Sequence, residues 1–315
     1  MLSAARRTAA GGGRPRWWAE LPLLAAVYLA YTAGRLLARG DVHTATGNGT
    51  ALLRLERALR LTPESALNRL FTTTPALGIP AAFAYAALHY LVTPAVLVWL
   101  WRRRPEDYRI LRSGLLIATL IGLAGFTLFP TAPPRLLDAG HGFTDSMAQY
   151  ADRGWWGGEA SAPRGLGGLT NQYAAMPSLH VGWALWCGAA VWRLAPSRVA
   201  RTLAAAYPVA IALVVMGTAN HYLLDVLAGA AVMGVGALLA RPFLRRTDAL
   251  RARAAGAGAH GGPPGDAYRG RVQGGDVSAG CETSAGERFP RQPTRGGRSA
   301  DGAAGAETEP AAAAH

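Results

Sequence analysis

Six long apolar stretches constrain what this chain can fold into more than any other feature. They lie at residues 17–38, 77–101, 109–130, 176–194, 199–219 and 222–243. A helix needs about 20 apolar residues to cross a bilayer, and its backbone must satisfy its own hydrogen bonds because lipid offers none. The sequence therefore predicts an all-α integral membrane protein with six transmembrane helices. The fourth stretch is the shortest and reaches full length only if its helix begins at Met176.

Composition divides the 315 residues into three parts. Residues 1–16 carry four arginines and are predicted to form a cytoplasmic N-terminal segment. Residues 17–243 form the six-span membrane domain, whose first span is long for a signal peptide and has no convincing cleavage site behind it. Residues 244–315 are rich in Arg, Gly and Ala and poor in large side chains, so we expect a disordered cytoplasmic tail.

Arginine placement predicts which side of the membrane each loop occupies. Arginines cluster in the N-terminal segment, after the second and fourth spans, and at the end of the sixth. Those segments fall on one side if all six spans form. Both termini are therefore predicted to be cytoplasmic and the 131–175 loop to lie outside, in a protein of the plasma membrane. The 40–75 loop is a counter-signal, because it would also lie outside and carries Arg54, Arg57, Arg60 and Arg69.

The formal net charge of +13 does not indicate a nucleic-acid partner. Every basic residue is arginine, and most of the arginines lie in short loops beside apolar spans or in the tail, as a membrane topology requires. The two cysteines, Cys187 and Cys281, lie in an apolar run and in the tail. They predict no disulfide framework and no cysteine metal site.

Both outer loops carry features that predict local structure. In ALLRLERALRL, Leu52, Leu55 and Leu59 share one helical face. Thr62-Pro63-Glu64 then has the pattern of an N-cap and a first helical turn. Two short interfacial helices fit this loop, either packed at the headgroup layer or serving as a lid over a site. In the 131–175 loop, Trp155 and Trp156 are expected to anchor the chain at headgroup level.

His221 and Asp225 form the first candidate catalytic pair. They are four residues apart at the start of the sixth span, so on a helix they would lie one above the other. An imidazole N–H is the obvious partner for a carboxylate at that depth, and the contact would fix the tautomer of His221. A purely structural clasp between helix ends is the alternative for the pair taken alone.

His180 favours catalysis over a structural clasp. It lies at the outer start of the fourth span, and two spans return the chain to the same membrane face at His221. Ser178 precedes His180 by two residues, and Arg135 follows the third span. The topology therefore predicts that two imidazoles, a carboxylate, a hydroxyl and a guanidinium meet at one depth.

This set suits phosphoryl transfer. One imidazole held by a carboxylate is a nucleophile, a second is a general acid for the departing oxygen, and a guanidinium matches phosphate oxygens. The set has no carboxylate cluster of the kind that Mg²⁺ requires. Zinc bound by His180, His221 and Asp225 is the chemical rival, but a nearby arginine favours an anion over a cation. We expect neither a metal nor a cofactor.

The strings FPTAPPR, NQYAAMPSLHVGWA and GTANHYLLDVLAG, between residues 129 and 229, carry a family resemblance. The pairing of PSLH with HYLLD resembles the second and third motifs of the type-2 phosphatidic acid phosphatase superfamily, and the fuller strings look like its inositol phosphorylceramide synthase (inositolphosphotransferase) branch. The resemblance covers about residues 50–240 and implies a six-helix fold with an outward-facing site. It implies that His221 is the nucleophile, forming a phosphohistidine, and that Asp225 orients it. His180 would then protonate the leaving alcohol, and Arg135 and Ser178 would hold phosphate oxygens.

The chain departs from the phosphatase pattern at two phosphate-binding cations. Leu128 stands where the first motif has lysine, and Val214 and Val215 stand where the third has Ser-Arg. A dianionic monoester needs those cations more than a diester with one charge does. We therefore predict transfer of a headgroup from a lipid phosphodiester to an alcohol. A lipid phosphatase, acting on phosphatidic acid or an isoprenyl phosphate with water as acceptor, is the alternative. A catalytically silent membrane scaffold or transporter is the alternative from another class.

Overall fold

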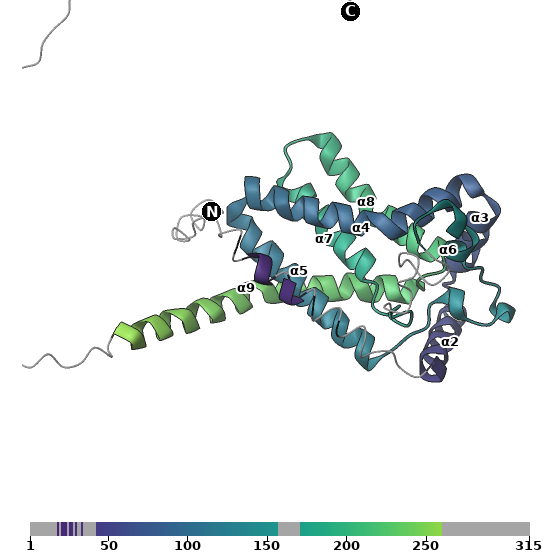
Figure 1. Cartoon of the computed structure of the whole chain (residues 1–315), viewed down its shortest axis with the longest axis horizontal. Helices are drawn as coiled ribbons and strands as arrows, with labels where there is room; N and C mark the ends of the chain where they lie inside the picture. The colour runs from purple at the N-terminus through teal and green to yellow at the C-terminus, as the bar shows by residue number, and fades with distance from the viewer. Residues whose placement is uncertain are drawn as a thin grey trace, which may run out of the picture. The chain divides into compact units, whose positions relative to one another are not determined.

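The computed structural model describes residues 42–156 and 171–259, together with single positions between 18 and 33 (Figure 1). The described residues form helices and no strand, apart from an isolated bridge between Thr131 and Ala174. The all-α prediction is confirmed for this part of the chain. The helices are α2 (Val42–Ala58), α3 (Pro63–Thr73), α4 (Pro75–Arg103), α5 (Pro105–Leu128), α6 (Ser146–Gln149), α7 (Leu179–Leu194), α8 (Arg198–Gly217) and α9 (Leu223–Ala259), with 3-10 turns η2 (Pro134–Leu136), η3 (Ala139–His141) and η4 (Ala151–Arg153).

Four helices of the described chain are long and apolar enough to cross a membrane: α4, α5, α8 and α9. They correspond to the second, third, fifth and sixth predicted spans and indicate a membrane protein. Prolines begin α4 and α5 at Pro75 and Pro105, where the missing N–H costs no helical hydrogen bond. The first predicted span lies mostly outside the described residues, so six spans are not established.

The fourth predicted span differs from expectation at its start. Helix α7 has 16 residues and begins at Leu179, so Met176, Pro177 and Ser178 do not extend it. Instead, the Ser178 N–H donates to the backbone oxygen of Asp225 at 2.9 Å, and the chain before it pairs with the loop after α5. A 16-residue helix is about 24 Å long, shorter than the roughly 30 Å hydrocarbon layer. Helix α7 is accordingly surrounded by other helices, and Val181, Ala184, Trp186, Cys187 and Ala190 are buried.

Close backbone contacts between α7 and α9 bring the two histidine-bearing segments together. A Cβ on Gly229 would lie 2.1 Å from the Ser178 oxygen, and a Cβ on Gly182 would lie 3.1 Å from the Gly229 oxygen. Only glycine at 229 lets the start of α7 approach α9 this closely. This crossing sets the distance between the sequence strings that contain His180 and His221.

The two short helices predicted in the first outer loop are present as α2 and α3. Leu52 is buried, whereas Leu55 and Leu59 are 49% and 54% exposed. The face of α2 that packs against the protein also contains Leu53 and Glu56. Figure 1 shows α2, α3 and α6 gathered at the end of the bundle where α9 begins. The two helices therefore pack against the end of the bundle that carries the candidate site.

Asn68 of α3 ties this region to the bundle. Its side chain, 1% exposed, donates to the backbone oxygens of Thr144 and Gly217 at 3.0 Å and accepts from the Thr144 N–H at 2.8 Å. Thr62 precedes α3 as predicted, but its side chain makes no capping hydrogen bond.

Two further expectations are corrected. Trp156 is not a headgroup anchor: it is fully buried, and its Nε1 donates to the Met147 oxygen at 2.9 Å. Trp155 is 46% exposed. Helix α9 continues past the predicted end of the sixth span at 243 to Ala259, so the start of the predicted tail is helical. The remainder of the predicted tail, residues 260–315, lies outside the described residues.

Candidate active site

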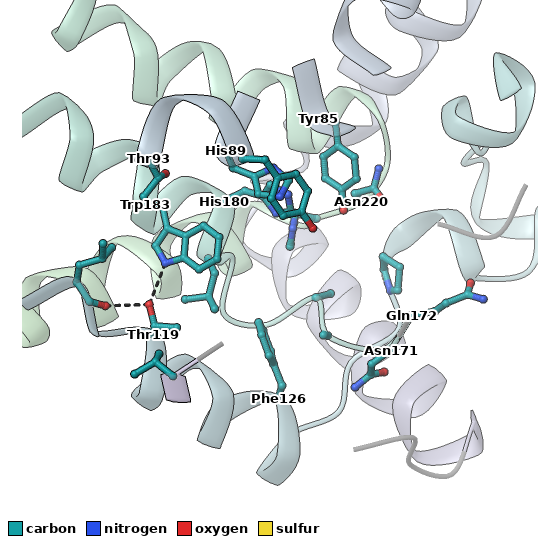
Figure 2. Close-up of a pocket in the computed structure, with 18 of the residues that line it drawn as sticks. Tyr85, His89, Thr93, Thr119, Phe126, Asn171, Gln172, His180, Trp183 and Asn220 are labelled. Carbon is teal, nitrogen blue, oxygen red and sulfur yellow. Dashed lines mark hydrogen bonds between the residues drawn. The ribbon is translucent and has the colours of Figure 1, made fainter. Parts of the chain in front are cut away.

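A cavity of about 410 Å³ opens among α4, α5, α7 and the loops that follow α5 and α8. Its polar lining includes Arg135, Asn171, Gln172, His180, Asn220 and His221. Its apolar lining includes Pro94, Leu97, Leu115, Leu116, Phe126 and Trp183. Figure 2 shows the three amides of Asn171, Gln172 and Asn220 on one side of the His180 ring and Trp183 on the other. The apolar residues Pro94, Leu97, Leu115 and Leu116 lie within α4 and α5, whereas the polar Arg135, Asn171 and Asn220 lie in the loops between the α-helices. The cavity thus has one end suited to an anion and one suited to a hydrocarbon chain.

The two predicted histidines face each other across this cavity. Their ring centroids are 5.9 Å apart, with the ring planes inclined by 61°. His180 is the second residue of α7, and His221 lies in the turn between α8 and α9, where its N–H donates to the Val215 oxygen at 3.1 Å. The structure therefore brings together the two imidazoles that the sequence places on different spans.

Asp225 contacts His221, but not through the predicted helical stacking. Helix α9 begins at Leu223, so His221 precedes it and Asp225 is its third residue. Asp225 Oδ2 lies 3.4 Å from His221 Nδ1 and accepts a hydrogen bond from the Tyr222 N–H at 2.9 Å. The first contact has an ion-pair distance and lacks hydrogen-bond geometry. The second resembles the back-bond of a capping box, which anchors the carboxylate at the helix start.

Arg135 is held rigidly at the cavity wall. Its backbone N–H donates to the Ala219 oxygen at 2.9 Å, which joins the loop after α5 to the turn after α8. Its Nε donates to Asn220 Oδ1 at 2.9 Å and its Nη1 to Asp145 Oδ2 at 3.0 Å. The Arg135 side chain is 2% exposed. Two hydrogen bonds already hold the guanidinium in place. An anion that binds to it therefore does not have to immobilise a flexible side chain.

These elements coincide with the match to a family model. The model of the PAP2 (type-2 phosphatidic acid phosphatase) superfamily matches residues 50–239, more than half of the chain. The chain belongs to the PAP2 superfamily. Membership implies a membrane setting, lipid phosphate substrates and phosphatase or phosphotransferase chemistry. No curated protein and no solved structure matches the chain.

Two predicted site residues, Ser178 and Asp225, do not line the cavity of this PAP2 protein, and of the two only Asp225 contacts a lining histidine. Ser178 is the more remote case. It is fully buried between the start of α7 and Gly229 and does not line the cavity. Its hydroxyl has no hydrogen-bond partner among the described residues. Its backbone N–H donates to the backbone oxygen of Asp225, so Ser178 is joined to the site through its main chain.

The aromatic residues that contact His180 were not predicted from the sequence. Tyr85 stacks on the His180 ring at 4.6 Å and 23°, and the His89 ring meets it edge-on at 4.4 Å. Figure 2 shows the three rings together. Tyr85 and His89 are four residues apart on α4, so they share a face. The sequence does contain a signal for them, because a tyrosine and a histidine four residues apart stand inside a predicted span. Polar side chains within the membrane are costly and usually have a function.

The residues at the positions of the missing phosphatase cations do not line the cavity. Leu128 ends α5 with 82% exposure, and neither Val214 nor Val215 contributes to the lining. Beside Arg135, the end of the cavity that suits an anion is lined by the neutral amides of Asn171, Gln172 and Asn220. No second guanidinium lines the cavity among the described residues. Within the described residues, no group of three or more His, Cys, Asp or Glu side chains is arranged to hold a metal ion.

Proposed function

We propose that this PAP2 protein is a lipid phosphotransferase of the inositolphosphotransferase type, acting on a lipid phosphodiester at the outer membrane face with both termini in the cytoplasm. The observation that carries the proposal is the placement of His180, His221 and Arg135 on one cavity with an apolar extension. The apolar end accommodates the hydrocarbon of a lipid, while the polar end receives its phosphate.

In the first step, His221 attacks the phosphorus. Its Nδ1 faces Asp225, which leaves Nε2 to form the N–P bond. The P–O bond to the lipid alcohol breaks, and His180 donates its proton to that departing oxygen. Arg135 and the neighbouring amides bind the non-bridging oxygens. The products of this step are a phosphohistidine that carries the headgroup and a free lipid alcohol.

In the second step, neutral His180 accepts the proton of an incoming alcohol. The alcohol oxygen attacks phosphorus, the N–P bond breaks, and His221 returns to its starting state with its electron pair. The headgroup phosphate is now joined to the new alcohol, and His180 is again protonated. Water in place of the alcohol would give hydrolysis through the same steps.

The preference for a diester rests on charge. Arg135 is already paired with Asp145, and its neighbours at the cavity are neutral amides. A diester brings one negative charge, whereas a monoester brings up to two and needs more compensation in a site partly screened from water. The lining therefore supports transfer of a phosphodiester headgroup over cleavage of phosphatidic acid.

The test is to give the purified protein lipids with labelled headgroups, phosphatidylinositol included, together with an alcohol acceptor such as a ceramide. We expect label in the acceptor lipid and little phosphate released from phosphatidic acid. Ready hydrolysis of phosphatidic acid without any headgroup transfer would replace the proposal with a lipid phosphatase. A folded protein inactive toward every lipid would favour a silent scaffold or transporter.

A further inference from the structure

Two buried glutamates lie behind the candidate site, at the start of α9. Glu56 of α2 and Glu64 of α3 are both fully buried. Glu56 Oε1 accepts a hydrogen bond from the Leu224 N–H at 2.6 Å. Leu224 is the residue before Asp225, so Glu56 holds the turn of chain from which the Asp225 carboxylate reaches His221. Neither glutamate lines the cavity or belongs to the proposed chemistry.

The pair has too few hydrogen-bond donors for two ionised carboxylates. Glu56 Oε2 and both Glu64 side-chain oxygens have no hydrogen-bond partner among the described residues. The donors of nearby Tyr222 are already used, since its hydroxyl donates to the Ala132 oxygen and its N–H to Asp225. The Glu64 carboxyl lies close enough to the Glu56 carboxyl for its charge to raise the pKa of Glu56. A hydrogen bond between two carboxyls requires a proton on one of them.

We propose that Glu56 and Glu64 are positioning residues for Asp225 and His221, and that they act as a carboxyl pair sharing one proton. The shared proton supplies the missing donor and keeps the second negative charge out of the buried space next to Asp225. Glu56 can then hold the Leu224 N–H, and with it the first turn of α9. Loss of the proton would leave the carboxylates of Glu56, Glu64 and Asp225 negatively charged in one buried space. Their repulsion would displace the first turn of α9. For its catalytic readout, this inference rests on the proposed transferase function.

The surroundings give the pair a defined pH dependence. Burial, and then the charges of its acidic neighbours, raises the pKa of Glu56 from 4.5 to about 8, and burial raises the pKa of Glu64. Three charged or titratable groups act on the pair: Asp225 in the first turn of α9, Tyr222 just before α9, and Arg57 on α2. Arg57 lowers the pKa of Glu64. The folded protein therefore binds this proton more tightly than the unfolded chain. The linked stabilisation is complete below about pH 4.5 and is lost as the pH rises through about 8.

The experiment compares Glu64→Gln, Glu56→Ala and Glu56→Gln with wild type, and uses Glu106→Gln, an exposed carboxyl at the cytoplasmic start of α5, as the control. Thermal unfolding and headgroup transfer are measured in detergent from about pH 5 to about pH 9, across the titration of the pair. Glu64→Gln replaces the shared proton with a permanent amide donor. We expect its melting temperature and transfer rate to fall less at alkaline pH than those of wild type and the control.

Glu56→Ala removes the acceptor of the Leu224 N–H. We expect its kcat to fall by roughly tenfold or more with KM little changed, because a buried donor without an acceptor no longer fixes the turn. Glu56→Gln retains an acceptor oxygen and should recover most of that loss. A Glu56→Ala protein with reduced melting temperature but wild-type kcat would refute the positioning role.

The stability readout separates this inference from the proposed function. If wild type is inactive toward every lipid, the proposed function fails, while the pH dependence of unfolding still decides whether the proton is shared. Identical alkaline loss of stability in wild type and Glu64→Gln would overturn the shared proton, whatever the activity.

Discussion

At the scale of single residues, the site depends on how Asp225 holds His221. The carboxylate is fully buried, and one of its oxygens accepts from the Tyr222 N–H while approaching His221 Nδ1. Its other oxygen has no hydrogen-bond partner among the described residues. This arrangement places the carboxylate charge next to the imidazole. In the proposed mechanism, that charge stabilises the positive charge that develops as His221 forms the N–P bond.

Asp225→Asn isolates that charge. The asparagine oxygen can still accept from the Tyr222 N–H, so the fold should persist, but the negative charge beside His221 is gone. We expect kcat for headgroup transfer to fall by about a hundredfold or more, within the range of acid–base and electrostatic contributions. Asp248→Asn, which removes a carboxylate from an exposed ion pair with Arg109, is the matched control. Wild-type kcat in Asp225→Asn would show that the charge plays no part.

His180→Gln separates the acid from the nucleophile. If His180 protonates the leaving alcohol, its loss should matter greatly for a lipid alkoxide and little for an aryl oxide that leaves without protonation. We expect a fall of about a hundredfold or more with the lipid substrate and a much smaller one with an aryl phosphodiester, measured as release of the first product. His221→Gln should lose both activities. An equal loss with both substrates in His180→Gln would assign His180 another role.

At the scale of elements, the crossing of α7 and α9 sets the geometry of the site. Gly229→Ala places a Cβ against the Ser178 oxygen at 2.1 Å, so the two helices must separate and carry His180 away from His221. Gly234→Ala, about 1.4 turns further along α9, meets nothing within 4 Å and gains helix propensity of up to about 1 kcal/mol. We expect Gly229→Ala to lose most activity and melting temperature and Gly234→Ala to retain both, in paired unfolding and transfer assays. Comparable behaviour of the two variants would show that the crossing is not critical.

Much of this arrangement follows from the sequence, because apolar length and the spacing of polar residues at span ends are local signals. The stretches at 77–101, 109–130, 199–219 and 222–243 became α4, α5, α8 and α9. The convergence of His180 with His221 followed from counting spans. The start of α7 did not follow, since the bond from the Ser178 N–H to the Asp225 oxygen is a long-range contact.

The residues that sequence analysis missed share one physical reason. Glu56 and Glu64 lie on short amphipathic helices, where a glutamate is normally on the solvated face. Their burial depends on how α2 and α3 pack against α9. The spacing of apolar residues along either helix does not reveal that packing. Tyr85 and His89 likewise belong to the site only because their rings contact His180. His180 lies 91 residues further along the chain than His89.

At the scale of the whole molecule, the site end and the opposite end should lie on different sides of the membrane. The 3-10 turn at Gly140 follows Arg135, and the turn at Ser197 joins the far ends of α7 and α8. Both positions are exposed. In a background without Cys281, we expect Gly140→Cys to react with an impermeant maleimide on intact cells and Ser197→Cys to react only after permeabilisation. The reverse pattern would place the site in the cytoplasm.

The central claim is that His221 carries the phosphoryl group, and trapping that intermediate tests it most directly. Wild-type protein is mixed with a lipid labelled in its headgroup phosphate, quenched within one turnover under alkaline conditions, and digested for peptide mapping. We expect acid-labile label on the peptide that contains His221, and no label on the same peptide of His221→Gln. Label on another residue, or single-turnover transfer with no labelled protein, would contradict it.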